Sequence, residues 1–273
     1  MSKRLELRQH LAILGDISGI MTAMKNLSLI ETRKLARFLA NQQRALAGIE
    51  SAVGDFLSFY PQPGNVAEER CVYLAIGSER GFCGEFNEEI TAALQACGET
   101  HRLVVVGRKL TAKLTDDPRV AATVEGPTVA EEVQAVLLRL MEALHGLGDD
   151  VPQHNSLKVL HHQDEQVVVR PLLPMPIQEF PAQRHSDPPL LNLPSAALYA
   201  ELVDHYLFAA LHQAFYASLM AENRYRLQHM ERALQRMEQE SSDLTLKYNV
   251  LRQEEIIEEI EIIMLSAETL AER

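Results

Sequence analysis

Helix-breaking residues are distributed very unevenly along this chain of 273 residues, and their distribution restricts the possible folds more than any other feature. Neither proline nor glycine occurs after Pro194, and no proline precedes Pro61. At 1.5 Å per residue, a helix from Pro194 to the end would be roughly 115 Å long, and one over Ser2–Tyr60 roughly 85 Å. Helices of this length do not fit inside a globule of this size. They must therefore pack on each other or on partners.

Both long segments carry apolar residues in alternating steps of four and three, which is the heptad pattern of a coiled coil. In the C-terminal segment the seam comprises Leu202, Tyr206, Ala209, Gln213, Tyr216, Met220, Asn223, Leu227, Met230, Leu234, Met237, Ser241, Leu244, Tyr248 and Leu251. In the N-terminal segment it comprises Leu35, Phe38, Gln42, Ala45, Ile49, Ala52 and Phe56. Because a compact middle separates the segments, we expect them to pair antiparallel, with the polar seam residues setting the register.

Beyond Leu251 the pattern changes. Glu255 and Glu258 would fall on the seam, while the apolar stripe moves to Ile256, Ile260, Ile263, Ala267 and Leu270. The run EEIIEEIE, residues 254–261, places five carboxylates beside these isoleucines. A run of charges is usually a solvated helix face, but here the other side of the same segment is apolar. We predict that this tip extends past its partner helix and meets another protein with apolar and basic surfaces.

The middle of the chain predicts a small α/β domain. The stretches CVYLAI, RLVVVGR, SLKVLHH and QVVVRPLL are typical of strands, and NEEITAALQAC, KLTAKL and TVAEEVQAVLLRLMEALH of helices. Their alternation predicts a mainly parallel sheet with a final hairpin, followed by the linker QEFPAQRHSDPPLLNLP. The predicted organisation is a helix over 1–60, an α/β domain with linker over 61–193, and a second helix over 194–273.

Composition excludes several classes of function. The formal net charge of −12 argues against nucleic acid as the main partner. The three cysteines are an odd number without CxxC spacing, so we expect reduced thiols in a cytosolic compartment. The charged start of the chain is not a signal peptide, and no stretch approaches the roughly 20 apolar residues of a membrane-spanning helix. We therefore expect a soluble protein, which can still work beside a membrane.

The turn GSERGFCGEFN, Gly77–Asn87, lies between a predicted strand and a predicted helix, where α/β folds bind phosphates. It lacks both the GxGxxG spacing and the lysine of a P-loop. Four glutamates in or beside it, at positions 79, 85, 88 and 89, would repel a pyrophosphate. We interpret it as a structural turn or a protein contact, and expect no bound cofactor.

Other candidates for chemistry are weak. His161 and His162 are adjacent on a predicted strand, so they face opposite sides of the sheet and cannot easily share a metal; a solvated hairpin is the stronger interpretation. Cys83 has no catalytic partner at a known spacing, which favours a buried, inert thiol. His205, His212 and His229 are expected to be solvated or on the seam. We predict no catalytic residue and no metal site.

Three segments of the chain resemble the γ subunit of F-type ATP synthases, the central rotor shaft. LTLKYNVLRQEEIIEEI, residues 244–260, is similar to the family's LTLxYNxxRQxxITxEL without a gap. SERGFCGEFN, residues 78–87, resembles SDRGLCGxxN, and TAMKNLSLIETRKL, residues 22–35, resembles TxAMKMVAxxKLRK. A weaker similarity relates AENRYRLQHM, residues 221–230, to SExxARMxAM.

This resemblance implies an antiparallel coiled coil with a small Rossmann-like α/β domain inserted between its helices. It implies a non-catalytic subunit that rotates inside a ring of three α and three β subunits, and whose α/β domain contacts the ε subunit and the membrane c-ring. The complex would lie on the cytoplasmic face of the bacterial inner membrane, with this chain peripheral. The coupling ion, proton or sodium, is determined by other subunits.

The resemblance also implies residue roles. Arg252 and Gln253 match a pair that binds acidic loops of the β subunit, a role suited to the planar fork of arginine. Met24 and Lys25 match a contact with the β lever segment, and Asn249 and Glu259 match positions near the same collar. Arg80 and Asn87 belong to the lower stalk.

Two departures from the family pattern favour a divergent F-type complex, of the kind some bacteria carry beside the standard enzyme. Gly19 stands where lysine is common, and Glu254, Glu255 and Glu258 add unusual negative charge. Two other functions stay open at this point. One is a coiled-coil scaffold or adaptor with an α/β head, and the other is a small enzyme that binds a nucleotide at the Gly77–Asn87 turn.

Overall fold

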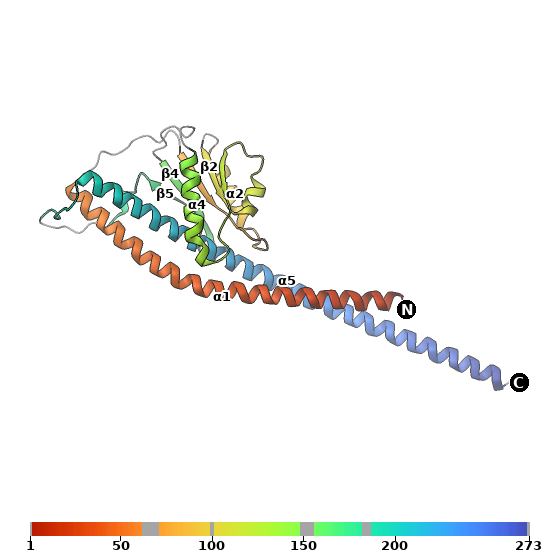
Figure 1. Ribbon diagram of the computed structural model, residues 1–273. Coiled ribbons are helices and arrows are strands. Elements are labelled where there is room, and N and C mark those ends of the chain that lie inside the picture. Colours follow the sequence, from red (N-terminus) through yellow and green to blue (C-terminus); the bar gives the residue numbers. More distant parts are fainter. Residues whose placement is uncertain (1, 62–70, 99–100, 148–155, 182–186, 272–273) are drawn as a thin grey trace. The chain divides into compact units, whose positions relative to one another are not determined.

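The computed structural model describes residues 2–61, 71–98, 101–147, 156–181 and 187–271. Two very long helices dominate it, α1 (Ser2–Phe59) and α5 (Ser195–Ala271) (Figure 1). Both agree closely with the helices predicted from the distribution of proline and glycine. Most of the PQPG break and part of the predicted linker, residues 182–186, lie outside the described residues.

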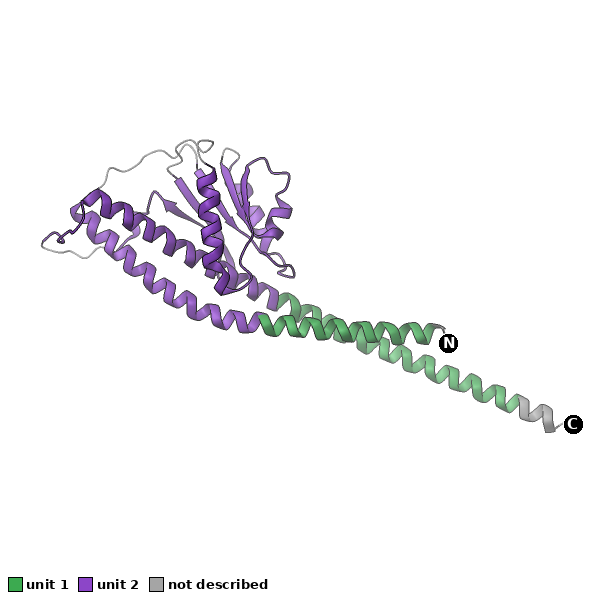
Figure 2. Cartoon of the chain, viewed as in Figure 1, with its two compact units in different colours: residues 1–27, 228–273 green, residues 28–227 purple. Residues whose placement is uncertain are grey.

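The chain divides into two compact units, which Figure 2 colours separately. One unit combines the first part of α1 with the last part of α5, residues 1–27 and 228–273. The other comprises residues 28–227 and contains the whole α/β domain together with the remaining parts of both helices.

The larger unit is built on a five-stranded sheet with strand order β3-β2-β1-β4-β5. The strands are β1 (Cys71–Ile76), β2 (Arg102–Val106), β3 (Val120–Val124), β4 (Ser156–Gln163) and β5 (Gln166–Leu173). The first four are parallel, and β4 and β5 form an antiparallel hairpin, as predicted. β3 was not predicted from the sequence; it is a short edge strand with little burial.

Helices cover both faces of this sheet. Alternate β1 residues point to opposite sides, so Tyr73 packs with α2 (Phe86–Ala96) and α3 (Arg108–Lys113), while Leu74 packs on the other side. That second face is covered by α4 (Val133–Gly146) and by the parts of α1 and α5 that belong to this unit. Two short 3-10 helices, η1 (Ala130–Glu132) and η3 (Ile177–Glu179), complete the elements. The long helices thus form one layer of the α/β core.

The predicted seam of α5 is confirmed, because every residue of the series from Leu202 to Leu251 is buried or half-buried. In α1 the prediction was half wrong. Leu35, Gln42, Ile49 and Phe56 are buried or half-buried as predicted, but Phe38, Ala45 and Ala52 are exposed. The residues next to these three, Leu39, Leu46 and Val53, are buried or half-buried in their place. Both series take steps of three and four, and the larger aliphatic side chains fill the core better than the two alanines.

In the smaller unit the two helices pair antiparallel. Arg4 bonds to Glu255 across the pair at 2.8 Å, and Lys25 bonds to Glu231, again at 2.8 Å. Leu14, which lies between Arg4 and Lys25 in the sequence, is buried, and so is Met230, which precedes Glu231. The pairing ends where α1 begins, and all described side chains of α5 from Ile256 to Leu265 are exposed.

Candidate partner-binding site

The end of α5 presents the predicted partner-binding residues on its surface. Asn249, Arg252 and Gln253 are exposed, and their spacing of three and four places them on one side of the helix together with Ile256. None of the three polar side chains hydrogen-bonds to another side chain in the described part of the chain. Ile256 is 45% exposed. This surface therefore combines free polar groups with uncovered apolar area.

The two predicted residues of α1 are placed differently. Met24 is half-buried, and the Lys25 ammonium donates a hydrogen bond to Glu231 of α5 at 2.8 Å. This bond lowers the pKa of the Glu231 carboxyl. Lys25 is thus already engaged within the helix pair, while Arg252 and Gln253 are not. The structure does not bring the α1 and α5 groups together in one cluster, and their contact with a partner stays a prediction.

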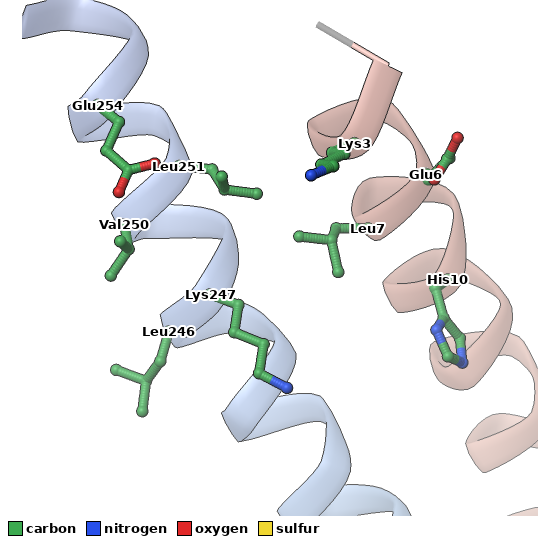
Figure 3. A pocket seen from close by; sticks show the side chains of 9 residues that line it. All are labelled: Lys3, Glu6, Leu7, His10, Leu246, Lys247, Val250, Leu251 and Glu254. Atoms are coloured by element: carbon green, nitrogen blue, oxygen red, sulfur yellow. The ribbon is translucent and has the colours of Figure 1, made fainter.

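A groove of about 650 Å³ lies between the paired ends of the helices (Figure 3). Leu7 of α1 and Leu251 of α5 point toward each other across it. Leu246 and Val250 add further apolar lining. The charged and polar residues of the lining come from both helices and are Lys3, Glu6, His10, Lys247 and Glu254. Leu246 and Val250 are more than half exposed. An open groove with exposed aliphatic residues is typical of a surface that another chain covers.

The turn that follows β1 is filled by its own side chains. Glu79 is 5% exposed, and its carboxylate accepts hydrogen bonds from the backbone N–H groups of Arg108, at 3.0 Å, and Gly126, at 2.8 Å. The Arg108 guanidinium also pairs with it. Gly107 (φ 102°) is required here, because a Cβ atom would come within 2.7 Å of the Gly77 and Ser78 carbonyl oxygens. A carboxylate of this turn thus binds backbone N–H groups at the start of α3 and at Gly126, which follows β3.

Asn87 closes the same turn from within. Its side-chain oxygen accepts a bond from the Ser78 N–H at 3.0 Å, and its amide donates to the Ser78 hydroxyl at 2.8 Å. Asn87 is buried, whereas Arg80 is exposed. The predicted lower-stalk contact of these two residues stays a prediction. In this structure the amide of Asn87 has an intramolecular role.

The turn that follows β1 is also held against α5 by hydrogen bonds. Arg226 donates a hydrogen bond to the Gly81 carbonyl at 3.3 Å and forms a buried ion pair with Glu222. The Glu222 carboxylate accepts bonds from the backbone N–H groups of Glu79 and Arg80. Burial raises the pKa of Glu222, although these bonds and Arg226 oppose the shift. In the sequence, Glu222 and Arg226 belong only to the weaker family resemblance of residues 221–230, and their contact with this distant turn was not predicted.

The two strand histidines are not solvated, which corrects the prediction. His161 and His162 are buried in opposite faces of the sheet, and burial lowers the pKa of each to about 4. His162 bonds to the Phe86 carbonyl at 2.9 Å. The prediction failed because α1, α2 and α5 cover β4. Among the described residues, no group of three metal-ligating side chains occurs.

The remaining candidate side chains, Cys83 and the histidines of α5, differ in burial. Cys83 is buried beside Ser78, and burial raises the pKa of its thiol, in agreement with an unreactive cysteine. His205 and His229 are exposed, while His212 is buried next to the seam. No helix in the described part of the chain is long and apolar enough to cross a membrane.

Comparisons with known proteins all identify similarity to subunits of ATP synthases. A family model described as ATP synthase matches residues 3–270. The ATP synthase gamma chain of Aliarcobacter butzleri is 24% identical over 289 residues, which cover 94% of this chain and 96% of that protein. The ATP synthase gamma chain of Syntrophobacter fumaroxidans is 28% identical over 242 residues, covering 84% of this chain and 81% of that one.

Solved structures share the fold. A chain of the Euglena gracilis mitochondrial ATP synthase rotor superposes with a TM-score of 0.65 and 16% identity, covering 93% of this chain and 99% of that one. A chain of the Tetrahymena thermophila mitochondrial ATP synthase central stalk and c-ring structure gives a TM-score of 0.56 and 17% identity, covering 78% and 99%. Long terminal helices around an α/β domain are therefore a shared architecture.

Proposed function

The chain belongs to the gamma-chain family of F-type ATP synthases, and from that premise we propose that it is the non-catalytic shaft that turns inside a ring of α and β subunits. In this role it binds no nucleotide. It couples ion flow through the membrane sector to ATP synthesis or hydrolysis at sites on the β subunits. Its part in the reaction is mechanical.

The observation that carries this proposal is the exposed end of α5. From Ile256 to Leu265 every described side chain is exposed, and seven of these ten residues are large and apolar. Soluble chains rarely leave so many large apolar side chains of one segment exposed to water. Just before this segment, Arg252 and Gln253 are exposed, so that their side chains are accessible to polar groups of a partner. A helix end of this kind supports insertion into a protein collar.

Rotation would act through differential binding. A shaft that lacks the threefold symmetry of the ring presents a different surface to each β subunit, so each orientation stabilises a different β conformation. By linkage, ATP hydrolysis in the ring must bias the orientation of the shaft by the same interaction free energy. Arg252 suits the contact, because its guanidinium can hold a carboxylate of the ring with two parallel hydrogen bonds.

The α/β domain would form the lower end of the stalk, next to the ε subunit and the c-ring. The side chains of Glu79 and Asn87 are both engaged in hydrogen bonds within the domain, which supports a role of the Gly77–Asn87 turn other than nucleotide binding. The buried contact of this turn with Glu222 and Arg226 supports a firm link between the α/β domain and the part of α5 that belongs to the same unit. The assembly would be peripheral, on the cytoplasmic face of the inner membrane.

The decisive experiment is the composition of the native complex. We expect the chain to co-purify with α and β subunits in a ratio of one to three to three, as measured by native mass spectrometry. The ratio should persist after the ring is washed free of membrane. A homodimer without ring subunits would contradict the proposal and support a coiled-coil scaffold.

A further inference from the structure

The end of α5 has apolar side chains around its whole circumference. The segment 256–265 contains Ile256, Ile257, Ile260, Ile262, Ile263, Met264 and Leu265, each between 45% and 66% exposed. At 3.6 residues per turn, these positions leave no arc wider than about 100° without an apolar side chain. A helix that is apolar all round is enclosed by protein, whereas a helix with one apolar stripe docks by that stripe alone. The partner of this segment must therefore surround it.

Three carboxylates lie within the same enclosed segment. Glu258, Glu259 and Glu261 alternate with the apolar residues and have no cationic partner among the residues that the structure describes. The segment itself contains no lysine, arginine or histidine. One helical turn earlier, Glu255 shows what such a carboxylate can bind, because it pairs with Arg4 of α1 at 2.8 Å. Of the described residues that precede Arg4, only Lys3 is cationic, and it lines the groove together with Glu254.

Enclosure and charge together restrict the partner. A carboxylate that is removed from water without a counter-charge is strongly disfavoured, so enclosed carboxylates require cations or several hydrogen-bond donors. We propose that the collar around residues 256–265 is a sleeve of apolar residues with lysine or arginine side chains facing Glu258, Glu259 and Glu261. This inference rests on the proposed function, and it adds the chemistry of the collar. The occupant is the ring of subunits that receives the shaft.

The test uses the full chain and the α and β subunits of the same organism. The affinity of the chain for the ring is measured at increasing salt, for the wild type and for the triple variant Glu258→Gln, Glu259→Gln, Glu261→Gln. With cations in the collar, neutral side chains leave these cations unpaired, and binding weakens about tenfold or more. With a purely apolar collar, the same change removes a desolvation cost, and binding strengthens. The direction of the change in affinity therefore distinguishes a cationic collar from a purely apolar one.

Matched controls exclude a general effect of charge. Glu201→Gln and Glu238→Gln remove exposed carboxylates elsewhere on α5 and are expected to leave the affinity within about twofold. The substituted side chains of the triple variant are exposed, so circular dichroism should report an unchanged helix content. Tighter or unchanged binding of the triple variant overturns the cationic collar while the proposed function stands. If the wild-type chain does not join the ring at all, both fail.

Discussion

The guanidinium group of Arg226 forms a buried ion pair with the carboxylate of Glu222, one helical turn earlier on α5. The pair does not serve the helix alone. Arg226 also binds the Gly81 carbonyl, and Glu222 accepts two backbone N–H groups of the turn after β1. Two charges and the backbone of a distant turn therefore depend on each other inside the core of the larger unit.

Breaking this pair is expected to destabilise the larger unit strongly. Arg226→Ala leaves the Glu222 carboxylate buried without its counter-charge, which typically costs about 3–5 kcal/mol of unfolding free energy. Urea unfolding followed by circular dichroism measures this loss. The control is Lys113→Ala, which breaks the exposed pair with Glu88 and should cost about 1 kcal/mol or less. Equal losses in the two variants would contradict a structural role of the buried pair.

Acid is expected to destabilise the larger unit through His161. Its pKa is lowered to about 4 in the folded chain by burial and by Arg170, against 6.5 for the ordinary side chain. Between these values the unfolded chain binds more protons, so unfolding free energy is lost as pH falls from about 6.5 toward 4. For this one histidine the loss at pH 5 is on the order of 2 kcal/mol.

The variant His161→Gln isolates that contribution. It removes the titrating group, so its unfolding free energy should fall less steeply between pH 7 and 5 than that of the wild type. His205→Gln removes an exposed histidine and should keep the wild-type slope. Thermal unfolding at several pH values measures all three proteins. Identical slopes for the wild type and His161→Gln would refute the assignment.

The long helices could be predicted because their evidence is local. The absence of proline and glycine determines where α5 can extend, and the heptad pattern identifies its buried side. The error in α1 has an equally local cause. Two series with alternating steps of three and four pass through Leu35, Gln42, Ile49 and Phe56. One continues through Phe38, Ala45 and Ala52 and the other through Leu39, Leu46 and Val53, and both sets are apolar. Only packing against the sheet selects Leu46 over Ala45.

The contacts of the turn could not be predicted, because they join distant segments. Glu79 is recognised by backbone groups 29 and 47 residues further along the chain, and backbone N–H groups leave no trace in the sequence. The glutamates around the turn are visible in the sequence, but only the structure shows that one of them binds the backbone at the start of α3 and at Gly126. Likewise, the burial of His161 depends on helices that come from both ends of the chain.

Arg252 is expected to matter for function and not for folding. It is exposed and makes no ion pair in the described part of the chain, so Arg252→Ala should change the unfolding free energy by less than about 0.5 kcal/mol. In the assembled complex, the same change removes a proposed charged contact with the β subunits. We expect the coupled ATPase rate to fall several-fold. Arg236→Ala, at another exposed arginine of α5, is the control, and an unchanged coupled rate for Arg252→Ala would argue against the contact.

The acidic end of α5 should restrict the exchange of this chain between F-type complexes. If the collar of this chain's own ring provides cations for Glu258, Glu259 and Glu261, a standard ring with an apolar or acidic collar should accept the chain poorly. We therefore expect this chain to fail to restore coupled ATP hydrolysis in a standard F-type complex that lacks its own γ subunit.

The failure should be relieved by removing the charges. In the standard complex, replacing the three glutamates by glutamine lowers the desolvation cost and the repulsion, so coupled hydrolysis should rise above that of the unmodified chain. In the chain's own complex the same variant should lose coupled hydrolysis, because cations of the collar lose their partners. ATP-driven ion pumping into vesicles measures both cases. Full restoration by the unmodified chain would show that its collar contacts are the ordinary ones of the family.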